Sequence, residues 1–193
     1  MNEKKALHPA LEAVIRRNEE QRRSAFRAAQ SSDAEKAPVG VGFLTLVATD
    51  AATGEIKQIE HGDNIVVKLG RKALAHLLAG DSVDQHKVVA MRFGDGSGTP
   101  GVADTGLFGA AILLAGGATQ RPVTVDFPDA AGDDMKVRFT AVVNADEGNG
   151  GGVQEYREAV LLKGDGNIFS HKVSGTITKD NTVVLTASWT YIF

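Results

Sequence analysis

The end of the chain alternates between apolar and other residues with a period of two. In the run TVVLTASWTYIF the apolar positions fall on one face: Val183, Leu185, Ala187, Trp189, Tyr191 and Phe193. Successive side chains of a strand point to opposite faces, so this pattern predicts a strand with one face in a core. The same period holds in most of the chain from residue 39 onward. It therefore indicates a mainly β fold.

Short turn sequences separate the alternating runs. AATG divides VGVGFLTLVATD from GEIKQIEHGDNIVVKL, which predicts a hairpin, and GDGN and TKDNT separate the last strands. The segments RPVTVDF and MKVRFTAVV predict a second strand pair, with the apolar face of the latter formed by Val137, Phe139, Ala141 and Val143. We expect an antiparallel β-sandwich over residues 39–193.

One segment inside this domain has the period of a helix. GRKALAHLLAG places Ala73, Leu74, Leu77 and Leu78 on one face and has Gly80 as a stop signal. It predicts one short helix inserted in the sandwich, followed by a buried strand over residues 88–93.

Residues 1–38 differ from everything after them. HPALEAVIRRNEEQRRSAFRAAQ has high helix propensity and no glycine, and SSDAEKAPVG reads as a linker. One face of the predicted helical arm carries the apolar residues Leu7, Leu11, Val14, Ile15 and Phe26. RRNEEQRR between them lacks any apolar residue, so a sustained coiled-coil seam is excluded. The arm either packs on its own domain or docks on neighbouring subunits; in the second case these five residues form the assembly interface.

Composition narrows the classes of partner. A length of 193 residues suits one domain with a good core, or one domain with an extension. The net charge of −3 offers no basic surface for nucleic acid. The apolar run at residues 107–115 is too short to span a membrane, and the charged N-terminus does not read as a signal peptide. Without cysteine, disulfides and thiolate metal sites are excluded.

A glycine-rich stretch follows the strand at residues 88–93. Gly96, Gly98 and Gly101 have the G-x-G-x-x-G spacing of a dinucleotide-binding loop. However, Pro100 removes a backbone N–H, no amphipathic helix follows, and no acidic residue lies about 20 positions further on. The stretch is therefore expected to be an exposed turn, and no cofactor is expected.

Other catalytic and metal-binding patterns are missing. The five histidines are scattered without the i, i+4 spacing of a helical zinc site, so each is expected at the surface or partly buried. The acidic loops DAAGDD, NADEGNGGG and KGDGN lack the ligand order of a calcium loop. Glu155 and Glu158 have no third partner for acid–base work. The sequence predicts neither an enzyme nor a metal site.

Three segments in order form a larger pattern: residues 64–80, 88–107 and 154–193. The residues that carry it are Asn64, Val66, Gly70, Arg71, Leu74, Leu77 and Leu78, then Gly94, Gly96, Pro100, Asp104, Thr105 and Leu107, then Tyr156, Glu158, Gly166, Ile168, Phe169, Ser170, Trp189, Tyr191 and Phe193. The set resembles a group of tailed-bacteriophage structural proteins found among tail-fibre, baseplate and collar components. The stretch from Glu158 to Leu161 departs from the usual E-L-G-L of that group.

This resemblance covers about two-thirds of the chain and none of residues 1–38. It implies a virion structural protein of the tail, baseplate or neck, assembled in the host cytoplasm as a homo-oligomer that holds other virion proteins. The alternative is a carbohydrate- or receptor-binding β-module of a tail fibre. That alternative calls for exposed aromatic residues, whereas the alternation assigns Trp189 to the core.

Overall fold

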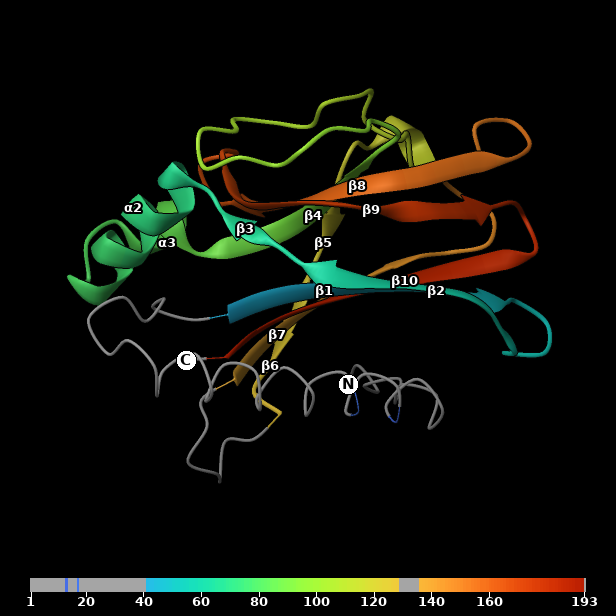
Figure 1. Cartoon of the computed structure of the whole chain (residues 1–193), viewed down its shortest axis with the longest axis horizontal. Coiled ribbons are helices and arrows are strands. Elements are labelled where there is room, and N and C mark those ends of the chain that lie inside the picture. Colours follow the sequence, from blue (N-terminus) through green and yellow to red (C-terminus); the bar gives the residue numbers. More distant parts are fainter. Residues whose placement is uncertain (1–12, 14–16, 18–40, 129–135, 193) are drawn as a thin grey trace.

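The computed structural model describes residues 13, 17, 41–128 and 136–192, and within them two antiparallel sheets lie face to face (Figure 1). The first sheet has the strand order β2 (Ile56–Asp63), β1 (Val41–Asp50), β10 (Val183–Ile192), β7 (Lys136–Val143) and β6 (Thr124–Asp126). The second has the order β3 (Ile65–Val66), β9 (Ile168–Lys179), β8 (Gln154–Lys163), β4 (Val88–Gly94) and β5 (Arg121–Pro122). The expected mainly β class is confirmed.

The main core fills the space between the two sheets. Trp189 of β10 is fully buried there, together with Phe139 and Val143 of β7 and Tyr156 of β8. The ring of Tyr191 meets that of Phe169 edge to face across the sheets, with centroids 5.7 Å apart. The alternating faces predicted for β10 and β7 are therefore confirmed for the residues described.

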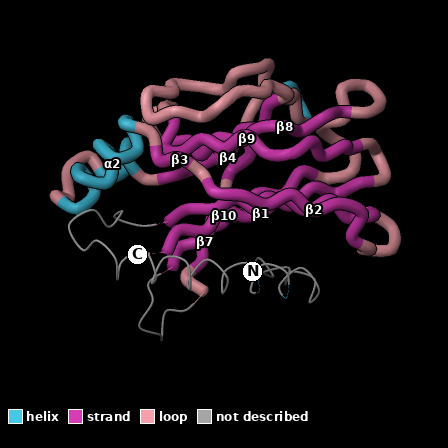
Figure 2. The backbone as a smooth tube through the Cα atoms, in the orientation of Figure 1, coloured by secondary structure: helices cyan, strands magenta, loops and turns pink. Residues whose placement is uncertain are grey.

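A second, smaller core covers the outer face of the second sheet. It contains Val67, Ala90, Val160, Leu162 and Ile168, with Leu107 packed against it. The long connection between β4 and β5 runs over this face (Figure 2). Because β8 is buried on both sides, its centre is a continuous apolar run and not an alternating one.

The expected first hairpin is only partly correct. β1 and β2 pair as predicted, but the second run then leaves the first sheet and continues as β3 in the second. Asn64 lies at the crossing: its side chain donates to the Tyr191 hydroxyl at 2.9 Å and also to Ser170. A period of two does not reveal that a strand changes sheet, so this division was missed.

The segment expected as one strand before β7 is divided in the same way. β5 pairs with β4 in the second sheet, whereas β6 pairs with β7 in the first, as predicted. Within the described residues the chain passes between the two sheets at β2–β3, β5–β6, β7–β8 and β9–β10, and the first two passages divide runs that were expected to stay in one sheet.

The helical content differs from the single helix predicted. α2 (Lys68–Leu78) is followed by a one-turn helix, α3 (Val83–His86), and a 3₁₀ turn, η1 (Ala115–Gly117), lies before β5. Ala73 is buried as expected, but Leu78 is 88% exposed, so that part of the prediction is wrong. Only the N-terminal part of α2 packs on β9, and its last turn extends beyond the sheet (Figure 1).

The predicted arm lies mostly outside the described residues. Ala13 and Arg17 are helical and exposed, while the domain boundary at residues 38/39 and the five apolar arm residues are not described. No helix in the described part is both long enough and apolar enough to cross a membrane.

Gly70 tests how α2 docks on the second sheet. A Cβ at this position would lie 2.0 Å from the carbonyl oxygen of Phe169. Alanine is the better helix former by about 1 kcal/mol, yet we expect Gly70→Ala to lower the melting temperature because α2 must move off β9. Gly106→Ala, where a Cβ would meet nothing within 4 Å, is the control and should change little. A Gly70→Ala protein that melts at or above the unmodified temperature would contradict this docking.

Candidate functional site

Three ionisable side chains meet on the outer face of the second sheet. His171 of β9 lies between two carboxylates: its Nδ1 is 2.7 Å from Asp104 Oδ2, and its Nε2 is 3.0 Å from Glu158 Oε2. His171 is fully buried and Glu158 is 1% exposed. Residues of β8 and the β4–β5 connection thus converge on one imidazole.

Glu158 also binds two parts of the β4–β5 connection that lie side by side, one at residue 96 and the other at residues 108–109. Its carboxylate accepts the backbone N–H groups of Gly96 at 3.0 Å, Phe108 at 2.9 Å and Gly109 at 2.8 Å. A Cβ on Gly96 would lie 2.2 Å from the backbone nitrogen of Gly109. Glycine is therefore required at position 96, where the backbone at the start of the connection approaches the backbone of Gly109.

The rest of this connection is fixed at further points. Asp104 accepts the N–H of Gly101 at 2.9 Å in addition to facing His171. The carbonyl of Val102 accepts the N–H of Lys68, the first residue of α2, at 2.7 Å. The ring of Phe108 lies 4.7 Å from that of His171. The connection is thus fastened to β8, β9 and α2.

This geometry decides how the glycine motif is used. A phosphate-binding loop aims its amides at a ligand, but here the amide of Gly96 points inward at the protein's own carboxylate. The glycine-rich stretch is an irregular loop held by Glu158, with Gly96 partly exposed. The expected loop after the strand is found, but the turn begins only at Val102, after the three glycines.

The histidine between two acids has only part of the geometry of a catalytic triad. In a triad one ring nitrogen faces a carboxylate and the other faces a nucleophile, whereas both nitrogens of His171 face carboxylates. A substrate has no access, since the imidazole is fully buried. What the three groups do in this structure is hold the connection on the sheet.

Two expectations are corrected here. Glu158 does have further partners, and His171 is neither at the surface nor only partly buried. Asp104 is 67 positions from His171, and Glu158 is 13 positions from it, so no local spacing reveals the contact. The only signal was the resemblance, which singled out Asp104 and Glu158 without giving them a role.

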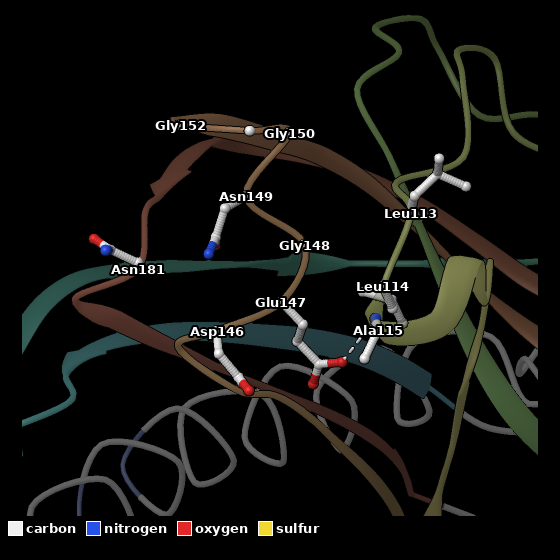
Figure 3. Close-up of a pocket in the computed structure, with 11 residues that line it drawn as sticks. Leu113, Leu114, Ala115, Asp146, Glu147, Gly148, Asn149, Gly150, Gly152 and Asn181 are labelled. Carbon is white, nitrogen blue, oxygen red and sulfur yellow. Dashed lines mark hydrogen bonds between the residues drawn. The ribbon is translucent and has the colours of Figure 1, made fainter.

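An open pocket of about 590 Å³ lies at another end of the domain, between the β7–β8 connection and residues 113–115 (Figure 3). Glu147 on its wall accepts the N–H groups of Asn144 at 2.9 Å and Ala115 at 3.2 Å, and pairs with Arg121. Burial by itself would raise the pKa of Glu147, but these N–H groups and the charge of Arg121 outweigh it and lower the pKa below 4.5. Glu147 thus joins the two walls.

A buried ammonium organises the same connection. Lys179 of β9 donates from Nζ to the Glu147 carbonyl at 2.7 Å and to Asn149 Oδ1 at 2.6 Å, with a further bond to the Ala145 carbonyl. Burial lowers the pKa of Lys179, and the negative charges of Glu147, Asp180 and Asp146 oppose that shift. The inward oxygens of NADEGNGGG, which were considered as calcium ligands, therefore bind a lysine. The acidic loop DAAGDD lies outside the described residues.

Two of the histidines expected to be scattered in fact lie together. The rings of His76 and His86 stack with centroids 4.3 Å apart, and His76 Nδ1 is 2.7 Å from Asp81 Oδ2. The turn after α2 brings them together across ten positions, a spacing that a search for helical i, i+4 pairs does not include.

The residues expected at an assembly interface, Leu7, Leu11, Val14, Ile15 and Phe26, all lie outside the described part of the chain.

Comparison of the chain with protein-family models, with curated proteins and with solved structures finds no match.

Glu158→Gln tests whether the buried carboxylate holds the connection. Three backbone N–H groups face the Glu158 carboxylate, so the amide NH₂ of glutamine would point at one of these donors. Leaving a buried donor without its acceptor costs about 1–3 kcal/mol, and we expect the melting temperature to fall by roughly 5 °C or more. Proteolytic cleavage within residues 97–108 should also become faster.

The matched control for this variant is Glu155→Gln, an exposed position three residues earlier on β8. It should leave both readouts unchanged. Equal stability of the two variants would show that Glu158 is dispensable for holding the connection.

The lowered pKa of Glu147 predicts that the free energy of unfolding falls at acidic pH. Its pKa is lower in the folded protein than its ordinary value of 4.5, so the unfolded chain binds more protons in this range. This contribution is complete above pH 4.5 and is lost as the pH falls through the folded pKa. We expect Glu147→Gln to be less stable at neutral pH and to lose less stability on acidification, measured by urea unfolding. A pH profile identical to that of the unmodified protein would contradict the role of Glu147.

Proposed function

We propose that this chain is a structural protein of a tailed-bacteriophage particle, in the tail, baseplate or neck, where it forms a homo-oligomer and holds other virion components. The observation that carries the proposal is the position of the resemblance residues. Asn64, Gly70, Gly96, Asp104 and Glu158 all make the contacts that fasten loops, α2 and the two sheets together. The residues of the resemblance are thus residues that stabilise the fold, as expected if this chain has the same fold as that group.

The chemistry of the interior favours a structural role over an enzymatic one. The His171 imidazole and the Glu158 carboxylate are closed to solvent, and each ring nitrogen of His171 faces a carboxylate. The described surface, in contrast, offers apolar side chains for contact with other proteins. Phe127, next to the edge strand β6, is 63% exposed, and Val125 within β6 is also exposed. An edge strand with apolar side chains is suited to protein–protein contact.

The alternative, a carbohydrate- or receptor-binding module, has less support. Sugars stack on exposed aromatic rings, but the one tryptophan and both tyrosines of this chain, Trp189, Tyr156 and Tyr191, are buried. Phe108 and Phe127 are the exposed large aromatics of the described part. Glycan binding that is lost on changing Phe108 or Phe127 would revive this alternative.

The direct test is the composition of purified particles from the phage that carries this gene. We expect quantitative mass spectrometry to find the chain at a fixed copy number, and light scattering or cryo-EM to find the isolated protein as a ring or other closed oligomer. A monomer in solution together with absence from particles would overturn the proposal.

The arm gives a sharper test of assembly. We propose that its apolar face docks on a neighbouring subunit or adjoining protein, so changing Leu11→Asp and Ile15→Asp together should sharply reduce incorporation into particles. Each change places an unpaired charge in an apolar contact. The measurement is particle occupancy, beside a melting curve of the isolated protein. A large fall in melting temperature would instead mean that the arm packs on its own domain.

A matched control uses the two described positions of the arm. Ala13 and Arg17 are helical and exposed, and Ala13→Asp with Arg17→Asn makes the same change in net charge as the test pair. It should leave incorporation normal. Equal loss in both double variants would attribute the effect to charge and contradict docking through the apolar face.

A further inference from the structure

We infer that His76, Asp81 and His86 form a binding site for a divalent transition-metal ion of the zinc class. Each of the three side chains offers one ligand atom, and these atoms lie within 4.8 Å of one another. The site is at the C-terminal end of α2, beyond Gly70 and Ala73, the residues of that helix that are buried. It is independent of the structural role proposed above.

The turn after α2 places two of the three groups. Gly80 has a φ of 68° and donates its N–H to the Leu77 carbonyl at 3.1 Å, while Asp81 donates its N–H to the His76 carbonyl at 2.9 Å. This pair of bonds is a Schellman motif, in which the second residue after the helix end returns to the last full turn. Asp81 is consequently held beside His76.

The third group comes from α3. Ser82 takes a left-handed conformation with a φ of 48°, which reverses the chain and lets α3 bring His86 against His76. α3 is itself attached to the β8–β9 turn, because Asp165 donates to the Gln85 carbonyl at 3.1 Å and Gly164 donates to the Lys87 carbonyl at 3.0 Å. The sheet thus fixes the position of His86.

A second observation points to a ligand. Nδ1 of His86 is shielded from solvent and has no hydrogen-bond partner among the described residues. Buried polar atoms are almost always paired, and an unpaired one calls for an explanation such as a bound ion. The unpaired nitrogen belongs to the ring that stacks on His76, next to a carboxylate.

The donor set selects the class of metal. Two imidazoles and one carboxylate suit zinc, copper, nickel and cobalt, whereas magnesium and calcium prefer oxygen ligands. Zinc bonds of about 2.0–2.2 Å put neighbouring ligands of a tetrahedron roughly 3.4 Å apart. The three ligand atoms, which lie within 4.8 Å of one another, therefore have to move closer together when zinc binds. Small side-chain rotations at the exposed end of the helix would achieve this. Three protein ligands leave a coordination position for water.

Metal titration of the full chain tests this inference. We expect one zinc ion to bind per chain by calorimetry, cobalt to give visible absorption bands of a four- or five-coordinate site, and zinc to raise the melting temperature. His76→Gln, Asp81→Asn and His86→Gln should each weaken zinc binding by more than about tenfold, since loss of even a supporting partner costs 10–100-fold.

Two controls separate this site from general effects. Asp84→Asn removes an exposed carboxylate of α3 that pairs with Lys87 and should keep full zinc affinity. The three ligand variants should retain the far-ultraviolet spectrum and melting temperature of the metal-free protein, because the site lies at the surface end of α2. Absence of saturable binding, or binding that survives all three ligand variants, would overturn the inference.

Discussion

The arrangement of the second sheet depends on one buried carboxylate. Glu158 is withdrawn from water on β8, and a charge in that position is strongly unfavourable unless donors surround it. Three of its donors are backbone N–H groups of the β4–β5 connection, and the fourth partner is His171, which in turn faces Asp104 of the same connection. Lifting the connection would remove three backbone N–H groups from Glu158 and the Asp104 carboxylate from His171, and would expose the apolar core around Leu162. The polar and the apolar contacts under this connection therefore stabilise the same arrangement.

Sequence reasoning succeeded where local periodicity carries the information. In β10 the apolar residues face the main core, while the hydroxyl residues Thr186, Ser188 and Thr190 alternate with them, so the strand and its inward face were predictable. It failed where the chain changes sheet, at Asn64 and between β5 and β6, since a period of two specifies a face and not the neighbouring strand. It also placed Leu78 in the core, because helical periodicity does not tell where a helix runs past the edge of the sheet.

The polar contacts could not be predicted from the sequence, for a different reason. A hydrogen bond between residues 67 positions apart, such as that between His171 and Asp104, leaves no periodic trace in the sequence. The same holds for Lys179, whose acceptors lie 30 and more positions away in a glycine-rich connection. Glycine spacing indicated that the chain leaves β4 in a loop, but the carboxylate that binds this loop could be identified only from the fold.

The residues that carry the resemblance and the features available for contact are largely different parts of this molecule. The former, such as Gly70 and Glu158, set distances between backbone segments, and any protein that uses this scaffold needs them whatever it binds. The latter lie at the periphery: the exposed apolar residues in and beside β6, and the histidine pair formed by the last turn of α2 and by α3. α2 connects the two sets, because Gly70 seats its first turn on β9 while Gly80 shapes the turn that presents His76 and Asp81. Because close packing on β9 fixes the first turns of α2, the residues at the other end of this helix keep their positions relative to the sheet.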